Sequence, residues 1–322
     1  MTGAEVKFGS YRILERLGEG GMCHVFRARR EDHRRDCALK VLKDEWRSDE
    51  KVCRMFTTEA DLSLMLEHST LVKGLEAGEV GGRMFLALEL VDGSSLGAAM
   101  RDAGRKGFPF PIDLALFAVS EVLDGLHAMH EAHGAGGEPL GLVHRDVTPD
   151  NVFLGFDGRV LIGDLGVAQV QAYGESTDVP LGKLGYMAPE MLQGELIDRR
   201  ADVFAAGVIA YELLTGQAPF AADSEEEALS KLADARCPRP SQLVPSIDPG
   251  LEHVLMTALA RRPKDRFDSA ETMLLELEPH WSKMLGNPFA IQALLSALRP
   301  FEAKAWRSSN SSPSVTSAWP KA

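Results

Sequence analysis

The spacing of apolar residues changes its period along the chain. Three early runs, YRILERLG from Tyr11, HVFRARR from His24 and DCALKVLK from Asp36, place apolar residues at roughly alternate positions between glycine and charged turns. A period of two is typical of β-strands that bury one face. These runs predict an antiparallel β meander, and RMFLALELVDG, ending at Gly93, predicts its last strand and a turn.

Residues 50–67 have the helical period instead, and Glu59 lies beside the apolar stripe. After Asp92 the sequence is mainly helical, with the strongest periodicity in residues 113–130, 202–216 and 251–262. The pattern predicts an α+β fold with a β-rich part at about residues 10–91 and a helical part at about 92–279. The predicted stripe of the first helix consists of Val52, Phe56, Ala60, Leu62, Met65 and Leu66.

The C-terminal residues differ from what precedes them. Residues 280–306 are predicted to be a helical extension, in which Pro288 to Leu298 form a short helix docked on the helical part. Residues 307–322 are rich in serine and are expected to be a disordered tail. His133 to Gly141 is expected to be a flexible surface loop.

Composition excludes several classes of function. The 322 residues include 35 basic and 47 acidic side chains, a net charge of −12 that disfavours nucleic acid and anionic membrane surfaces as partners. The four cysteines form no CxxC pair, which argues against a zinc site and favours a reducing compartment. No run approaches the ~20 apolar residues of a membrane helix, and no signal peptide precedes the strands. We therefore expect a cytoplasmic protein.

A glycine-rich turn is the first candidate for chemistry. In LGEGGMCHVF, Gly18, Gly20 and Gly21 leave backbone N–H groups accessible to phosphate oxygens, although such a turn is more often only a hairpin. Lys40 ends a predicted strand, and Glu59 follows 19 residues later on the predicted helix. Either residue alone is more often a solvated surface charge. Their order after the glycine turn suggests a phosphate site.

The most specific signal is VHRDVTPDNV, Val143 to Val152, followed by GDLG from Gly163. With Ala188-Pro189-Glu190, Asp202 and Arg266, these motifs resemble the eukaryotic-like (Hanks-type) bacterial serine/threonine protein kinase family over about residues 10–279. The resemblance implies a bilobal kinase-like fold with an antiparallel β N-lobe and a mostly helical C-lobe. It also implies transfer of the γ-phosphate of ATP to serine or threonine hydroxyls of protein substrates.

The resemblance assigns a role to each motif. Asp146 would accept or orient the substrate hydroxyl, Asn151 and Asp164 would hold Mg2+ (Mn2+ is an alternative), and Lys40, fixed by Glu59, would grip the phosphates. His144 would be structural. The nucleotide would be held by the glycine loop, by apolar contacts to adenine, and by the backbone of Glu89 and Val91. The predicted adenine contacts are Leu17, Val25, Ala38 and Phe153.

The chain departs from the family pattern at two related positions. Thr148 stands where the serine/threonine members usually have a lysine, and Lys183 stands where they commonly have a threonine. We hypothesise that Lys183 supplies the ammonium and Thr148 the hydroxyl, so that the charge around Asp146 is kept. The alternative for Lys183 is a solvated loop lysine. If Thr148 abolishes catalysis instead, the chain is an ATP-binding pseudokinase that acts as a scaffold.

Regulation and partners follow from the same resemblance. Arg145 would bind a phosphorylated activation segment, with Ser176 or Thr177 as candidate phosphosites. Phosphorylation in trans would require self-association. A small-molecule phosphotransferase of related fold is disfavoured by the GYMAPE segment ending at Glu190, which such enzymes lack. The sequence therefore predicts a signalling protein kinase.

Overall fold

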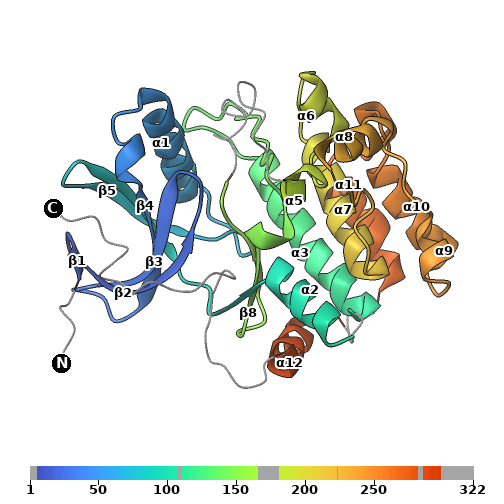
Figure 1. Cartoon of the computed structure of the whole chain (residues 1–322), viewed down its shortest axis with the longest axis horizontal. Helices are drawn as coiled ribbons and strands as arrows, with labels where there is room; N and C mark the ends of the chain where they lie inside the picture. The colour runs from blue at the N-terminus through green and yellow to red at the C-terminus, as the bar shows by residue number, and fades with distance from the viewer. Residues whose placement is uncertain (1–5, 108–109, 166–180, 223, 282–285, 299–322) are drawn as a thin grey trace. The chain divides into compact units, whose positions relative to one another are not determined.

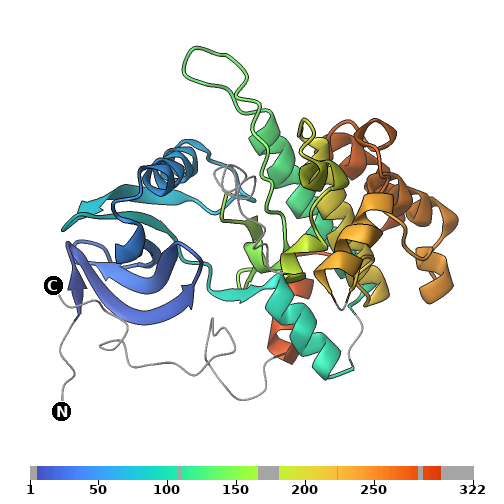
Figure 2. The ribbon, with the colours of Figure 1, turned by 45° about the horizontal axis from the view of Figure 1, so that its top comes forward.

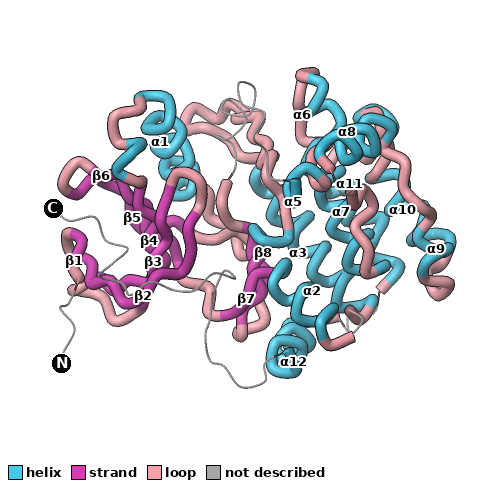
Figure 3. Tube along the Cα trace, in the orientation of Figure 1, coloured by secondary structure: helices cyan, strands magenta, loops and turns pink. Residues whose placement is uncertain are grey.

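The computed structural model describes residues 6–107, 110–165, 181–222, 224–281 and 286–298. These residues form two compact units. Unit 1 holds residues 6–67 and 72–93, and unit 2 holds residues 68–71 and 94–298. Figure 3 shows the six-stranded sheet in unit 1 and most of the helices in unit 2.

Unit 1 is built on one antiparallel sheet with strand order β1-β2-β3-β4-β6-β5. The predicted strands at 11–18, 24–30 and 36–43 are confirmed, and the strand predicted at the start of residues 83–93 is β6, which ends at Glu89. Two strands were not predicted: β1 has only two residues, and β5, with the sequence GLEAGEV, has few of the β-branched and aromatic residues that mark strands. The strands are β1 (Lys7–Phe8), β2 (Tyr11–Glu19), β3 (Cys23–Arg30), β4 (Asp36–Leu42), β5 (Gly74–Val80) and β6 (Arg83–Glu89).

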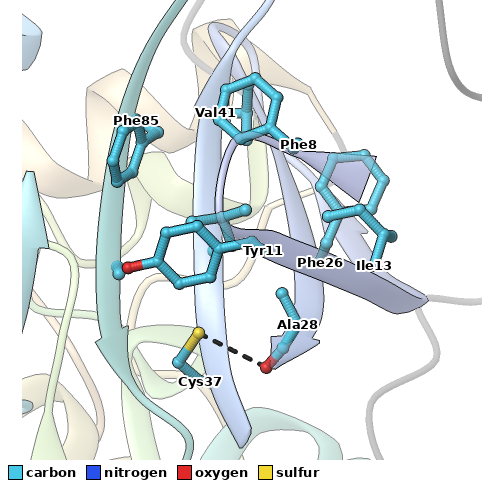
Figure 4. Packing of buried hydrophobic residues seen from close by; sticks show 10 residues of the cluster. Phe8, Tyr11, Ile13, Phe26, Ala28, Cys37, Val41 and Phe85 are labelled. Carbon is cyan, nitrogen blue, oxygen red and sulfur yellow. Dashed lines mark hydrogen bonds between the residues drawn. The ribbon is translucent and has the colours of Figure 1, made fainter. Parts of the chain in front are cut away.

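An aromatic cluster fills one face of this sheet (Figure 4). Phe8 and Tyr11 both pack edge-on against Phe85, with ring centroids 5.7 and 5.6 Å apart. The Cys37 thiol donates a hydrogen bond to the Ala28 carbonyl at 3.4 Å, and burial raises the pKa of this thiol to about 11. Alternate residues of the strands supply the cluster, as the period of two predicts.

Helix α1 (Glu50–Met65) covers the other face, and the carboxylate of its N-cap residue, Asp49, accepts hydrogen bonds from two backbone N–H groups. The predicted stripe was partly wrong. Met65 is 45% exposed and Leu62 is only half-buried, whereas Met55, Glu59 and Ser63 are buried. The strict i, i+3, i+4 spacing from Val52 leads to these residues, so the buried stripe contains two polar side chains.

Close approach between β5 and α1 depends on Gly74. A Cβ at this position would lie 2.4 Å from the Ser63 carbonyl oxygen. The Ser63 hydroxyl in turn donates to the Glu59 carbonyl at 2.7 Å. The strand therefore packs directly on the helix turn that follows Glu59, which fixes the height of α1 on the sheet.

Unit 2 is mainly helical, and its two central helices, α3 and α7, are buried on nearly all sides. The three strongest predicted helices are confirmed, although the third ends at Ala258 rather than at 262, shortly before Pro263. Its longer helices are α2 (Leu96–Arg105), α3 (Ile112–His130), α7 (Arg200–Thr215), α8 (Glu225–Asp234), α10 (Pro249–Ala258), α11 (Ala270–Leu277) and α12 (Pro288–Leu298). Its short helices are α5 (Leu181–Leu184), α6 (Pro189–Gln193) and α9 (Pro240–Leu243).

A small sheet of β7 (Gly93–Ser95), β8 (Val152–Gly155) and β9 (Val160–Ile162) completes the fold. The segment His68–Leu71 joins unit 2 because the Ile162 amide donates to the Thr70 carbonyl at 2.8 Å. Residues 133–141 project beyond the C-terminal end of α3 as a loop closed by a bond from Leu140 N to Ala132 O (Figure 2). Within the described ranges, no helix combines the length and the apolar character needed to cross a membrane.

Candidate active site

One buried carboxylate binds the backbone of the loop that carries Asp146. Asp202, on α7 and 1% exposed, accepts hydrogen bonds from the backbone N–H of His144 at 2.7 Å and of Arg145 at 2.8 Å. Its Oδ2 also lies 2.8 Å from His130 Nε2. These bonds stabilise Arg145 at φ +67°, a left-handed conformation that costs about 1–2 kcal/mol for a residue with a Cβ. The contribution of His130 was not predicted; its position at the end of a helical run was the only signal.

Asp146 and Asn151 are joined directly. Asn151 ends the 3-10 turn η2 (Pro149–Asn151), and its Nδ2 donates to Asp146 O at 2.8 Å and to Asp146 Oδ2 at 3.0 Å. The Asp146 amide donates to His144 Nδ1 at 3.3 Å, which agrees with a structural role for that histidine. Since the amide nitrogen of Asn151 is turned to Asp146, its carbonyl oxygen is the atom that can ligate a metal.

Lys183 reaches the same carboxylate. Its Nζ lies 2.7 Å from Asp146 Oδ2 and 3.0 Å from Oδ1, with side chains 35% and 9% exposed. Thr148, 6% exposed, is two residues away, and its hydroxyl has no hydrogen-bond partner among the described residues. The ammonium of Lys183 is thus placed to neutralise Asp146, whereas the Thr148 hydroxyl makes no hydrogen bond to that carboxylate.

Two anchors hold the segment that carries Lys183. Glu190 at the start of α6 forms a two-pronged ion pair with Arg266, at 2.6 and 2.8 Å, and both side chains are buried. The Tyr186 hydroxyl donates to Glu212 on α7. Burial raises the pKa of Tyr186 and, with help from nearby Asp150, that of Glu212. The phenol therefore remains a hydrogen-bond donor at neutral pH.

Strand register brings the two predicted metal ligands to one end of a hairpin. Val152 pairs with Ile162 in antiparallel register, so Asn151, just before Val152, and Gly163, just after Ile162, lie at the same end. The Gly163 amide donates to the backbone carbonyl of Asn151 at 2.9 Å. Asp164 comes next, at φ +55°. No group of three or more His, Cys, Asp or Glu side chains suited to a metal occurs among the described residues. One amide and one carboxylate suit Mg2+, which takes its other ligands from phosphates and water.

In unit 1, Lys40, predicted to bind phosphate, is paired with Glu59. Lys40 on β4 lies with its Nζ 2.5 Å from Glu59 Oε1 on α1, and their side chains are 12% and 8% exposed. Val25 is directly opposite Lys40 across the β3–β4 pairing. Buried ion pairs of this kind fix both partners, so Lys40 is presented in one orientation at the sheet.

The three glycines of the predicted loop have room around them. None of the three has a positive φ angle. A Cβ at Gly18 or Gly21 would meet no atom within 4 Å. At Gly20 the nearest atom would be Cys23 O at 3.9 Å. Local backbone geometry therefore does not demand glycine here. The space beside their backbone is open.

The predicted adenine contacts divide between the units. Leu17 and Ala38 are buried in unit 1 and Val25 is half-buried, whereas Phe153 lies on β8 in unit 2. The Glu89 amide donates to Lys73 O at 2.9 Å. The Glu89 amide is thus engaged within the protein, and its carbonyl is the backbone group of this residue that could accept a hydrogen bond from an adenine amino group. Val91 follows two residues later.

Cys23 stands where the GxGxxG pattern of phosphate-binding loops has its last glycine, and it is a core residue. It is 3% exposed and packs with Leu42, Phe56 and Leu86 between the sheet and α1. We predict that Cys23→Gly lowers the free energy of unfolding by about 2 kcal/mol, because it removes buried contacts and adds backbone freedom. Urea unfolding measures the change, and Cys23→Ala should lose less. A Cys23→Gly variant as stable as the wild type would contradict this role.

The candidate phosphosites Ser176 and Thr177 lie outside the described residues. Arg145, the residue predicted to bind them once phosphorylated, is half-buried, and its Nε has no hydrogen-bond partner within the described part of the chain. A guanidinium nitrogen that is buried without a partner is costly, so an anion there would be stabilising.

Comparison with known proteins gives a consistent result. The model of the protein kinase domain family matches residues 11–276. The chain is 33% identical over 289 residues to the tyrosine-protein kinase MasK of Myxococcus xanthus, covering 88% of this chain and 45% of that protein. It is 32% identical over 300 residues to the serine/threonine-protein kinase PknL of Mycobacterium tuberculosis, covering 92% and 72%. A crystal structure of the M. tuberculosis PknI kinase domain matches with a TM-score of 0.65 and 27% identity, over 87% of this chain and 99% of that one.

Proposed function

This chain belongs to the protein kinase family, in its bacterial Hanks-type serine/threonine branch, and we propose that residues 10–279 transfer the γ-phosphate of ATP to protein hydroxyls. The observation that carries the proposal is the joining of Asp146, Asn151 and Lys183 within hydrogen-bond distance. Phosphoryl transfer depends on positioning and charge neutralisation, and this group supplies both.

Each residue contributes one part. Asp146 accepts or orients the substrate hydroxyl, and Asn151 fixes that carboxylate through its Nδ2 at 3.0 Å from Oδ2. Lys40, held by Glu59 at 2.5 Å, neutralises charge on the α- and β-phosphates. The backbone of the glycine loop from Gly18 covers the phosphates. No covalent intermediate on the protein is needed.

Asn151 and Asp164 are the proposed ligands of Mg2+, with Mn2+ as an alternative. Their oxygen atoms match the preference of these hard cations, and phosphate oxygens would complete the coordination. A bound ion would supply positive charge that offsets the negative charge of the phosphates.

Lys183 is proposed to replace the ammonium that the family usually places at position 148. Its Nζ is paired with the Asp146 carboxylate at 2.7 Å. A γ-phosphate arriving beside Asp146 would compete for that ammonium, which would then neutralise the phosphate and leave the carboxylate for the substrate hydroxyl. The pseudokinase alternative depends on Thr148, and a Lys183 ammonium beside Asp146 argues against it.

Substrates are proposed to be proteins, with serine or threonine as acceptors. Arg145 would order a segment phosphorylated at Ser176 or Thr177, and phosphorylation in trans would require transient self-association. The net charge of −12 argues against nucleic acid as a partner. Since ATP is the phosphate donor, we place the domain in the cytoplasm, as part of a signalling system.

Transfer of labelled γ-phosphate tests the function. Wild type with Mg2+ is expected to label itself and a generic basic protein, whereas Asp164→Ala should not, because it removes a proposed metal ligand. Phosphoamino-acid analysis of the product identifies the acceptor, which matters because one relative is named a tyrosine kinase. Nucleotide binding without labelling by the wild type would reject the proposal.

A further inference from the structure

Helix α12 lies beyond the part of the chain that matches the kinase family, which ends at residue 276. One face of the helix is buried against α2 and β8 (Figure 1). That face consists of Ile291, Leu294, Leu295 and Leu298, each at most 7% exposed. Phe289, by contrast, is 77% exposed on the same helix. The docking is therefore one-sided and apolar.

Both ends of α12 are held by specific contacts. At its C-terminal end, Lys106 Nζ donates to the carbonyls of Ala297 at 3.0 Å and Leu298 at 2.8 Å, where a cation also opposes the helix dipole. At its N-terminal end, Pro288 contacts Gly158 in the β8–β9 turn. A Cβ on Gly158, which has φ +88°, would lie 2.5 Å from Pro288 Cβ. A side chain at position 158 would therefore collide with the first residue of the helix.

The two elements beneath α12 also hold the η2 turn. Gly97 of α2 lies so close to Asp150 that a Cβ there would be 2.4 Å from its Oδ1, and Arg101 Nη2 reaches the same oxygen at 3.1 Å. β8 begins at Val152, the residue directly after Asn151. The residue before Asn151 is therefore held by α2, and the residue after it begins β8. Both α2 and β8 pack against α12.

We propose that α12 is a positioning element of the active site, which fixes α2 and β8 and through them the η2 turn that presents Asn151. The proposal rests on the proposed kinase function. Displacement of a catalytic group by about 1 Å can cost up to about 10²-fold in rate. A helix that only covered apolar surface would affect stability and leave the kinetics unchanged. The catalytic unit thus extends to residue 298.

The test compares the same substitution on the two faces of the helix. Leu294→Asp, which places a charge on the buried face, is expected to release α12, lower kcat about tenfold and raise the free Mg2+ needed for half-maximal activity about threefold. Phe289→Asp, on the exposed face, is expected to leave both quantities at the wild-type value. Assays are run well below the melting temperature of each variant, so that unfolding does not contribute.

Hydrogen exchange separates this proposal from the kinase function itself. Amides of residues 149–155 are expected to exchange faster in Leu294→Asp than in Phe289→Asp, whether or not the wild type transfers phosphate. Unchanged exchange, or an unchanged kcat and Mg2+ requirement in an active enzyme, would overturn the proposal. If Leu294→Asp does not fold, Lys106→Met is expected to change both quantities in the same direction and Lys106→Arg to restore them, and an unaltered Lys106→Met overturns it.

Discussion

Lys183→Ala is expected to lower kcat for phosphotransfer by about 10²- to 10³-fold, the usual effect of removing one charge-stabilising donor from a reacting centre. The Nζ lies 2.7 Å from Asp146 Oδ2, and no lysine occupies position 148 to replace it. The KM for ATP should change little, because the lost interaction concerns the transferred phosphate rather than the nucleotide as a whole. Steady-state kinetics over a range of ATP concentrations separates the two.

The exchanged variant Thr148→Lys/Lys183→Thr sharpens this test. It restores the usual family arrangement and should recover most of the activity that Lys183→Ala loses, since the charge near Asp146 is the same. Lys264→Ala, an exposed lysine of unit 2, is the control and should behave as wild type. Lys183→Ala with near-wild-type kcat would show that Lys183 is a solvated lysine and would refute the exchange hypothesis.

Arg266→Met is expected to lower the free energy of unfolding by about 3–5 kcal/mol, because it leaves the buried Glu190 carboxylate without its partner. The arginine is 0% and the glutamate 2% exposed at the side chain. Arg266 also donates to the carbonyls of Arg200, Ala260 and Arg261 and lies 4.8 Å over the Phe204 ring. Since whole domains are stable by about 5–15 kcal/mol, the loss is a large part of the total.

A nearby arginine provides the matched control. Arg262 pairs with Asp265 at 2.5 Å, but these side chains are 65% and 41% exposed. Arg262→Met should therefore change stability by no more than about 1 kcal/mol. Urea unfolding monitored by fluorescence compares the two variants. Equal, small effects would mean that the buried pair is replaceable, and we would then no longer regard Glu190 as an anchor of the Lys183 segment.

The sequence alone determined most of the helices and strands and the residues that carry the chemistry. Period-two runs identified most strands of unit 1, and helical periods identified α1, α3, α7 and α10, because these elements bury one face or all faces against a core. The motifs around Asp146, Asn151 and Asp164 identified the kinase family, since few other functions need these groups at that spacing. The unusual residues at 148 and 183 were also visible as a related pair.

Tertiary structure decided what local pattern does not encode. β5 has a weak strand signal and exists through its pairing with β6 and the close approach of Gly74 to α1. The buried stripe of α1 includes Glu59 and Ser63, because the ion pair with Lys40 and a backbone bond satisfy them. Hydrophobicity alone favours apolar neighbours at those positions.

Long-range contacts likewise set the site. Lys183 and Asp146 are 37 residues apart in the sequence, and His130 and Asp202 are 72 residues apart. Composition and periodicity describe neighbours in sequence, whereas these pairs depend on how α3, α5 and α7 pack. The sequence by itself determined which residues could do the chemistry. Only the packed chain decided which of them meet, because side-chain reach is a few ångströms and the fold alone brings distant residues within it.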